Sequence, residues 1–424
     1  MRYFTPLIKL RTYLPLTIML VSCLIVLINV SFKIIALQNL LFTANSLISP
    51  LITGCYLLIL SFCNEQEQQQ ALNQSLLALY LFSIGIYLLV DLPGADSGLD
   101  NIVYQIVFEA IPRKFFSATA AFITCFYIPY FLSRYYYKAL LSHPKKRMLL
   151  ALAGGLSFFT IDFLLLFADP QAEQFSHMLV DSVLVTLALH LVVGILYLLS
   201  LLMQAPHVEY QPSRNQPPLF YSLTILAVIS LLICLSCEYR LIEFGNGWLM
   251  TSSALLFPIV IMISSVVSEI YDIKANCILI AALIIAELVF EFLLMAIILL
   301  PSPDFFDLNP FYSLVMPRRV LASTAAIIIT LVANTVILRN LKASSYGASR
   351  AFRVIIANMV ANSLLCLVNY SLLFAGFYPY EQIMGLVLNS WVYKLITSII
   401  CLPIVLSLCD RYVESKLPDL HKRA

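Results

Sequence analysis

A short stretch in the second half of the chain places polar groups inside an apolar segment. In FPIVIMISSVVSEIYDIKAN, residues 257–276, an apolar start is followed by hydroxyl and acidic side chains: Ser264, Ser265, Ser268, Glu269 and Tyr271. An ionisable group at membrane depth costs roughly 2.5 to 3.5 kcal/mol on insertion scales, so it indicates a functional site by default. A carboxylate and hydroxyls on one helix suit a polar, nitrogen-containing heterocycle, whose ring faces aromatic or aliphatic side chains would cover.

Three asparagines in a later apolar run share one helical face. Asn358, Asn362 and Asn369 are four and seven residues apart, which stacks their amides along one stripe. Such amides either hold neighbouring helices together, where a bond contributes about 0.6 kcal/mol on average, or line a binding site. Lys394 either neutralises Glu269 or meets a carbonyl of a bound molecule, and the sequence leaves both possibilities open.

Other ionisable side chains also fall in apolar runs: Glu287, Glu291, Asp162 and His190. The two glutamates are one helical turn apart and share a face. The five histidines are scattered, and the ten cysteines form no paired CxxC units. We therefore predict no metal site, no cofactor and no enzyme activity, since a membrane enzyme would need a nucleophile and base or a metal cluster at working spacing.

The elements that must position these groups are membrane helices. Of 424 residues, 61% are hydrophobic and 11% charged, and the mean hydropathy is +0.92. A span needs about 20 apolar residues, and unbroken runs of that length form helices rather than barrel strands. The sequence predicts twelve spans: 14–35, 41–63, 72–92, 115–136, 148–168, 178–203, 219–241, 248–270, 277–300, 320–338, 354–377 and 384–409.

The distribution of positive charge predicts the topology. With a cytoplasmic N-terminus, most of the 25 lysines and arginines fall on the cytoplasmic side, so both termini are predicted inside. The first apolar run follows Arg2, Lys9 and Arg11 and contains LVSC, but it continues too far for a signal peptide and reads as a first span. The net charge of +2 suggests no polyanion partner such as nucleic acid. The predicted partners are membrane lipid and a small-molecule substrate.

The chain contains an internal duplication. IPRKFFSATAAFI at 111–123 matches MPRRVLASTAAII at 316–328, KIIALQN at 33–39 matches RLIEFGN at 240–246, and 187–202 lies over 391–406. Pro50 and Pro258 match as well, and the order and the offset of 204 to 208 residues are kept throughout. We predict an all-α polytopic protein with two parallel six-helix repeats, 1–206 and 207–424, joined by the polar, proline-rich linker 204–218.

The duplicated motifs carry basic residues on the side predicted to be external. Arg113 and Arg318 each follow a proline in the same motif, and we expect retained roles for them. Lys114 and Arg319 occupy the next position, where a basic side chain either has such a role or extends to the membrane interface.

The second half resembles the queuosine precursor transporter family, also called the vitamin uptake transporter (VUT) family. The stretch at 257–276 resembles its second-helix signature, and VMPRRVLASTAA at 315–326 resembles its fourth-helix start. ANSLLCLVNYSLLFAGF at 361–377 and VYKLITSIICLPIVL at 392–406 resemble its last two helices. The resemblance implies a six-helix fold similar to vitamin-binding S components, and uptake of queuine or a related 7-deazaguanine precursor through a bacterial cytoplasmic membrane.

The chain departs from the family pattern at defined positions. Ser265 and Asn369 stand where the family has Asp, and Asp272 stands where it has Gly. The first half has diverged further: it keeps Arg113 and Asp162, and has His190 in place of Lys394.

Three functional interpretations follow for the whole chain. We predict a transporter, whose candidate substrate-binding residues include Arg318 and Lys394. No G-x-x-x-x-G-K phosphate loop occurs, so an S component with a separate energising partner is the first alternative. A non-transporting membrane protein derived from a transporter is the second.

Overall fold

The fold is described by a computed structural model. The described residues are 13–95, 110–136, 143–167, 175–202, 218–245, 247–271, 273–303, 309–344 and 349–421. The predicted boundary between residues 206 and 207, the linker as far as residue 217, and Asp272 lie outside them.

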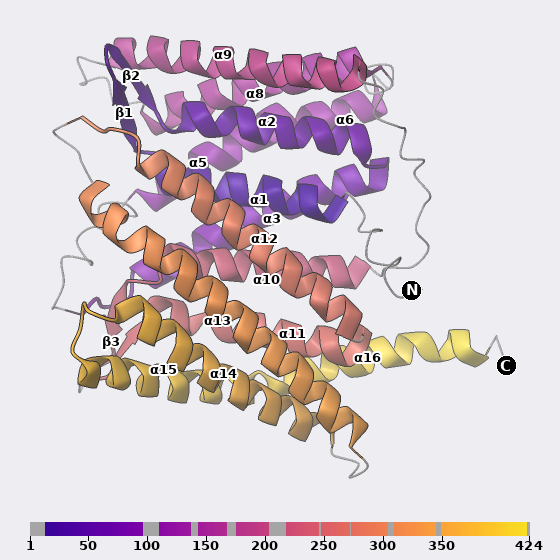
Figure 1. The fold of residues 1–424 in the computed structure, drawn as a ribbon. Coiled ribbons are helices and arrows are strands. Elements are labelled where there is room, and N and C mark those ends of the chain that lie inside the picture. Colours follow the sequence, from indigo (N-terminus) through magenta and orange to yellow (C-terminus); the bar gives the residue numbers. More distant parts are fainter. Residues whose placement is uncertain are drawn as a thin grey trace. The chain divides into compact units, whose positions relative to one another are not determined.

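The described chain is almost entirely helical (Figure 1). Its helices are α1 (Tyr13–Val30), α2 (Asn45–Phe62), α3 (Glu65–Val90), α5 (Ile111–Phe122), α6 (Ile128–Tyr135), α8 (Pro144–Leu166), α9 (Phe175–Leu202), α10 (Pro218–Ser236), α11 (Phe257–Tyr271), α12 (Ile273–Ile298), α13 (Asn309–Ala343), α14 (Arg350–Phe374), α15 (Tyr380–Ile400) and α16 (Leu402–His421). A π-helical turn joins α5 to α6. Among the described residues, twelve helical segments are long and apolar enough to cross a membrane, which confirms the all-α polytopic prediction.

Two short β-hairpins interrupt segments that the sequence predicted as helix. Strands β1 (Ile34–Leu37) and β2 (Leu40–Thr43) pair antiparallel after α1, and β3 (Leu241–Glu243) and β4 (Leu249–Thr251) pair after α10. The predicted spans 14–35, 41–63, 219–241 and 248–270 were therefore each wrong at one end. Apolar, β-branched residues suit a strand as well as a helix. The turns determine that these residues form strands: Gln38 and Gly245 have positive φ angles of 53° and 72°, which reverse the chain.

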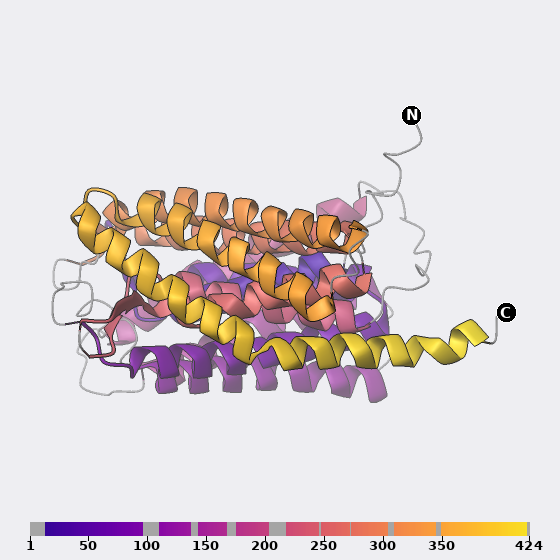
Figure 2. The ribbon, with the colours of Figure 1, turned by 90° about the horizontal axis from the view of Figure 1, so that it is seen from below.

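The last predicted span, 384–409, was also wrong at its end. Helix α15 ends at Ile400, and α16 continues from Leu402 in a new direction (Figure 2). Pro403 has no backbone N–H to donate to the preceding turn and its ring crowds that turn, which favours a kink or a break there.

The chain divides into two compact units. Unit 1 contains Met1–Tyr87, Ile106–Pro218 and Phe292–Ser313, and unit 2 contains Leu88–Gln105, Leu219–Glu291 and Leu314–Ala424. Each unit thus includes one short segment from the other half of the sequence. The compact units differ from the two predicted repeats by this exchange, and the repeats themselves stay a prediction.

In each unit, a basic side chain binds the short segment that comes from the other half of the sequence. In unit 1, Lys33 donates from Nζ to the carbonyls of Ile298 and Leu300 at 2.5 and 2.9 Å. In unit 2, the guanidinium of Arg240 donates to the carbonyl of Leu92 at 2.7 Å. Lys33 and Arg240 are partners in the duplicated motif, and each binds carbonyls at the end of a corresponding helix.

Backbone hydrogen bonds of the two hairpins also connect corresponding residues of the two halves. The N–H of Ala36 donates to the carbonyl of Pro301 at 3.0 Å, and that of Glu243 donates to Pro93 at 3.2 Å. Both pairs of corresponding residues keep the offset of 207 to 208. These reciprocal contacts support the duplication that the sequence predicts.

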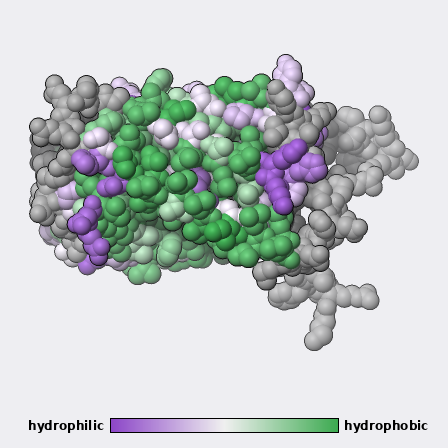
Figure 3. Space-filling model, turned by 90° about the horizontal axis from the view of Figure 1, so that it is seen from above, coloured by the Kyte–Doolittle hydropathy of each residue, from purple (hydrophilic) through white to green (hydrophobic). Residues whose placement is uncertain are grey.

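A broad apolar surface suits the helices to a lipid environment. The face in Figure 3 is hydrophobic across its middle, and hydrophilic residues gather toward both ends. On α9 the side chains of Leu184, Leu191, Ile195 and Leu196 are all more than half exposed. Large exposed apolar areas are rare on soluble monomers, so this surface agrees with a multi-pass membrane protein.

Candidate substrate-binding site

The three asparagines on α14 are buried, and each forms a hydrogen bond with a different side chain. Asn358 accepts a hydrogen bond from Ser265 at 2.7 Å, Asn362 donates to Ser398 at 3.3 Å, and Asn369 donates to Glu238 at 2.6 Å. The stripe along α14 therefore faces the interior of unit 2, as its spacing predicted.

The serines in the middle of α11 belong to a hydrogen-bonded contact between helices. Ser264 and Asn276 of α12 are 3.0 to 3.1 Å apart, and Asn276 also donates to Thr335 of α13 at 2.6 Å. Asn334 donates to Ser265 at 3.1 Å. These two serines thus connect α11 to α12, α13 and α14.

Glu269 lies at the end of α11 among basic side chains. Its side chain is 3% exposed and accepts hydrogen bonds from Arg353 at 3.0 and 3.3 Å. Arg350 and Lys342 lie 3.8 and 3.9 Å from the same carboxylate. Close by, Tyr271 contacts the rings of Phe220 and Tyr412. The buried acid is therefore neutralised by arginine, and a bound molecule is not needed to explain it.

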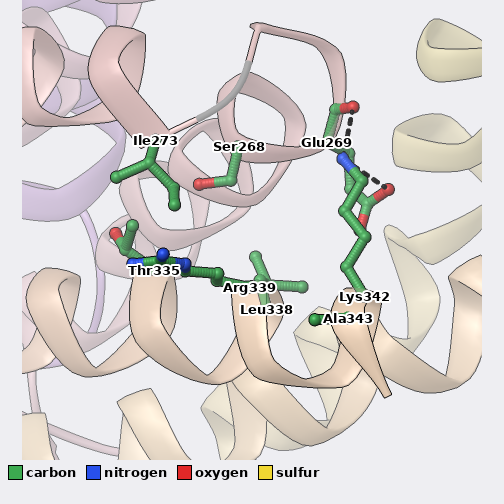
Figure 4. A pocket seen from close by; sticks show the side chains of 8 residues that line it. All are labelled: Ser268, Glu269, Ile273, Thr335, Leu338, Arg339, Lys342 and Ala343. Atoms are coloured by element: carbon green, nitrogen blue, oxygen red, sulfur yellow. Dashed lines mark hydrogen bonds and ion pairs between the residues drawn. The ribbon is translucent and has the colours of Figure 1, made fainter. Parts of the chain in front are cut away.

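A hollow of about 210 Å³ opens beside this carboxylate (Figure 4). Ser268, Glu269, Arg339 and Lys342 are among the residues that line it. We call it the Glu269 pocket.

Lys394 belongs to a separate cluster toward the other end of α14. Its ammonium group lies 3.4 Å from both the Tyr370 hydroxyl and the Cys366 sulfur, and it faces the rings of Tyr370 and Phe257. Arg353, which holds Glu269, is seventeen positions from Tyr370 on α14, or roughly 25 Å at 1.5 Å per residue. Of the two roles that the sequence left open for Lys394, neutralising Glu269 is therefore wrong.

Glu238 is a buried acid that the sequence analysis missed. It lies in the turn between α10 and β3 and accepts the hydrogen bond from Asn369. Burial raises the pKa of its carboxyl to about 7, against the lowering effects of Asn369, Arg319 and Lys394, while Glu291 raises it further. The signal was present, because Glu238 falls inside the predicted span 219–241.

A buried ion pair lies near Glu238. Arg319 and Glu291 are 2.7 Å apart and 3% and 1% exposed, and Arg319 also donates to the carbonyl of Leu235 at 3.1 Å. The interface position considered for Arg319 is therefore wrong, and Lys114, its counterpart, is buried as well. One turn from Glu291, Glu287 accepts hydrogen bonds from Ser323 and Thr324 at 2.5 and 3.0 Å.

Several acceptor oxygens of this region have no hydrogen-bond partner among the described residues. They are Glu238 Oε2, Glu287 Oε2, Glu291 Oε1, Asn362 Oδ1 and Asn369 Oδ1. Buried polar atoms are normally satisfied, so unpaired ones mark a place for water, an ion or a ligand. We call Glu238, Glu287, Glu291, Arg319, Asn369, Tyr370 and Lys394 the acidic cluster. Its unpartnered oxygens can accept hydrogen bonds from N–H donors, and the Lys394 ammonium group can donate to a carbonyl.

The remaining predicted residues lie elsewhere. Arg318 is exposed and donates to the carbonyl of Ala375 at 2.6 Å, with Phe377 beneath its guanidinium. In unit 1, Arg113 is exposed and donates to Leu165 at 3.2 Å.

Two buried residues of unit 1 are hydrogen-bonded within that unit. Asp162 accepts from Asn45 at 2.6 Å, and His190 lies 2.9 Å from the Thr53 hydroxyl. These contacts place both residues in the interior of unit 1, in the region that corresponds to the acidic cluster.

Unit 1 lacks the carboxylates of the acidic cluster. At the duplication offset of 207 to 208 residues, Ser31 corresponds to Glu238, Leu79 to Glu287 and Ser83 to Glu291. The full set of acids is thus a feature of unit 2.

The comparisons with known proteins agree with this asymmetry. The model of a family described as "Putative vitamin uptake transporter" matches residues 251–408. No curated protein and no solved structure matches the chain. The matched segment contains α11 to α15, which carry Glu287, Glu291, Arg319, Asn369 and Lys394. Over these residues the chain is similar to the vitamin uptake transporter (VUT) family.

Proposed function

We propose that the protein imports a small heterocyclic nutrient, and that its substrate is a queuosine precursor, queuine or a related 7-deazaguanine. Supporting this, twelve apolar helices and the family match point to a membrane transporter for vitamin-like uptake. The substrate class rests on the resemblance of the second half to queuosine precursor transporters and on the chemistry of the acidic cluster.

The unpartnered oxygens of the acidic cluster carry the proposal. A 7-deazaguanine ring presents ring N–H groups and an exocyclic amine, which are donors, beside a single carbonyl acceptor. Buried carboxylate and amide oxygens match the donors, and Lys394 or Arg319 matches the carbonyl. The rings of Tyr370 and Phe257 beside Lys394 offer apolar faces to a flat ligand.

The charge distribution of unit 2 supports the orientation of the protein. Lys342, Arg350 and Arg353 gather around Glu269 at one end of α14, and the acidic cluster lies toward the other end. Cytoplasmic ends of membrane helices are enriched in Lys and Arg. We therefore place the protein in a bacterial cytoplasmic membrane, with both termini inside and the acidic cluster toward the outer side.

Complementation tests the function. A bacterium unable to make or import queuosine precursors would express the chain, and queuosine in its tRNA would be measured after feeding queuine or its precursors. We expect the wild type to restore queuosine and the Lys394→Met variant to fail, because Lys394 is the member of the acidic cluster proposed to bind the substrate carbonyl. Glu269→Gln should keep uptake above that of Lys394→Met. If wild type restores nothing with any precursor, the substrate assignment is wrong.

Uptake should depend on pH through Glu238. Binding of a donor ligand needs the ionised carboxylate, whose fraction rises about tenfold per pH unit below its pKa of about 7. We expect the affinity of the purified protein for labelled substrate to rise about eightfold from pH 5.5 to 6.5 and to level off above about 7.5. The Glu238→Gln variant should lose this slope. An unchanged slope in that variant would assign the titration to another group.

The stability of the protein without substrate should fall as the pH rises, whereas substrate affinity rises. Since the folded-state pKa of Glu238 lies above its usual range, the folded protein holds this proton more tightly than the unfolded chain. The contribution of Glu238 to the free energy of unfolding therefore falls as the pH rises toward 7.

A further inference from the structure

The Glu269 pocket carries a surplus of positive charge. Lys342 and Arg339 line it, while Arg350 and Arg353 lie against the Glu269 carboxylate. Asp410 also pairs with Arg350. The residues that line the pocket bring two cations, Arg339 and Lys342, and one carboxylate, Glu269, and this balance favours an anion.

Two donors face the hollow without a described acceptor. Ser268 is 8% exposed, and its hydroxyl has no hydrogen-bond partner among the described residues. Arg339 forms no ion pair with a described residue, and Figure 4 shows its guanidinium on the same hollow as the Ser268 hydroxyl. Lys342 reaches the Glu269 end of the hollow, donating to the Glu269 carbonyl at 3.2 Å. A guanidinium, an ammonium and a hydroxyl around one hollow are groups that bind phosphate oxygens.

We propose that the Glu269 pocket binds a phosphate group. The hollow of about 210 Å³ is large enough for one phosphate with part of its substituent. It lies where the spans Ser252–Tyr271 and Pro317–Ala343 end and the span Ile273–Ile298 begins, which is the level of lipid headgroups. Ile273 and Leu338 add apolar lining. Basic pockets between membrane helices on the cytoplasmic side bind anionic headgroups, so the headgroup of an anionic lipid is the source to test first.

This site lies toward the opposite end of α14 from the acidic cluster, so its test does not depend on the transported substrate. Purified protein would be equilibrated with phosphatidylglycerol and phosphatidylcholine of the same acyl chains, and the retained lipid measured by native mass spectrometry. We expect wild type to prefer phosphatidylglycerol at least about fivefold, since each cation near a headgroup contributes about that factor. The Arg339→Gln/Lys342→Gln variant should lose the preference, and Ser268→Ala should weaken it.

Arg411→Gln is the matched control, because Arg411 is exposed on α16 and does not line the pocket. Arg339→Lys, which keeps the charge, should retain most of the preference and shows that loss in the double variant is not misfolding. An equal preference for phosphatidylglycerol in wild type and the double variant would overturn the site.

A second arm separates lipid from free phosphate. In phosphatidylcholine nanodiscs, titration with inorganic phosphate would be followed by phosphorus NMR. If wild type shows no lipid preference but binds phosphate saturably, and the double variant does not, the pocket is a phosphate site filled from solution. If wild type shows neither a lipid preference nor saturable phosphate binding, the proposal is wrong.

Discussion

Glu238→Gln is expected to reduce substrate uptake about a hundredfold while the protein still folds. Glutamine can keep one oxygen for the hydrogen bond from Asn369, but it replaces the unpartnered Oε2 with an NH₂ group. A donor on the substrate then loses a charged acceptor and meets a second donor. Hydrogen bonds to charged groups contribute about 1.5 to 3 kcal/mol, and a mismatched buried donor adds to the loss. Initial rates of labelled precursor uptake, normalised to protein in the membrane, measure the effect.

The matched control is Glu67→Gln in unit 1. Glu67 is also a buried acid, but it accepts a hydrogen bond from the Asn64 N–H at the start of α3 and has no place in the acidic cluster. The same substitution there should leave uptake within about twofold, since its cost is that of a helix cap. Equal losses in the two variants would mean that Glu238 supports the fold and not the substrate.

Arg319→Met is expected to destabilise unit 2 by about 3 to 5 kcal/mol, because it leaves Glu291 buried without its cation at 2.7 Å. Replacing both members of a buried ion pair with apolar residues is often neutral for stability. The Arg319→Met/Glu291→Met variant should therefore recover most of the melting temperature. Thermal unfolding of the detergent-solubilised protein, followed by size-exclusion chromatography, measures both effects.

Uptake by the double variant then separates two roles of the pair. If Glu291 and Arg319 contact the substrate, the restabilised protein should still transport at less than about a tenth of the wild-type rate. Wild-type transport by that variant would show that the pair serves stability alone. Arg318→Met is the control for stability: this neighbour is exposed, and its loss should cost less than about 1 kcal/mol.

The membrane class and most of the helices could be predicted from the sequence because hydrocarbon imposes a length and an internal hydrogen-bond rule on each segment. The two hairpins could not be predicted in this way. Residues 34–37 and the pair Leu241 and Ile242 are as apolar as the helices before them, and the turn conformations at Gln38 and Gly245 direct them into strands. Periodicity has no signal for such short elements.

The polar face of α14 was also readable from spacing. Asn358, Asn362 and Asn369 are all buried and bonded to other elements. Their partners could not be predicted, because residue spacing shows which side chains share a helix face but does not show which helix packs against that face. Glu269 and Lys394 both looked like members of one site. The length of α14 separates them, and Arg353 takes the place expected for Lys394.

The sequence by itself determined that the chain is a polytopic membrane protein with duplicated motifs and acids that must be sheltered from lipid. These properties follow from composition and from spacing along a single helix. Only the tertiary structure decided which acids are neutralised: Glu269 by Arg353, and Glu291 by Arg319, while Glu238 keeps an oxygen without a described partner. The physical reason is that the strength of a buried charge interaction depends on distances of a few ångströms between helices, which residue spacing along one helix does not fix.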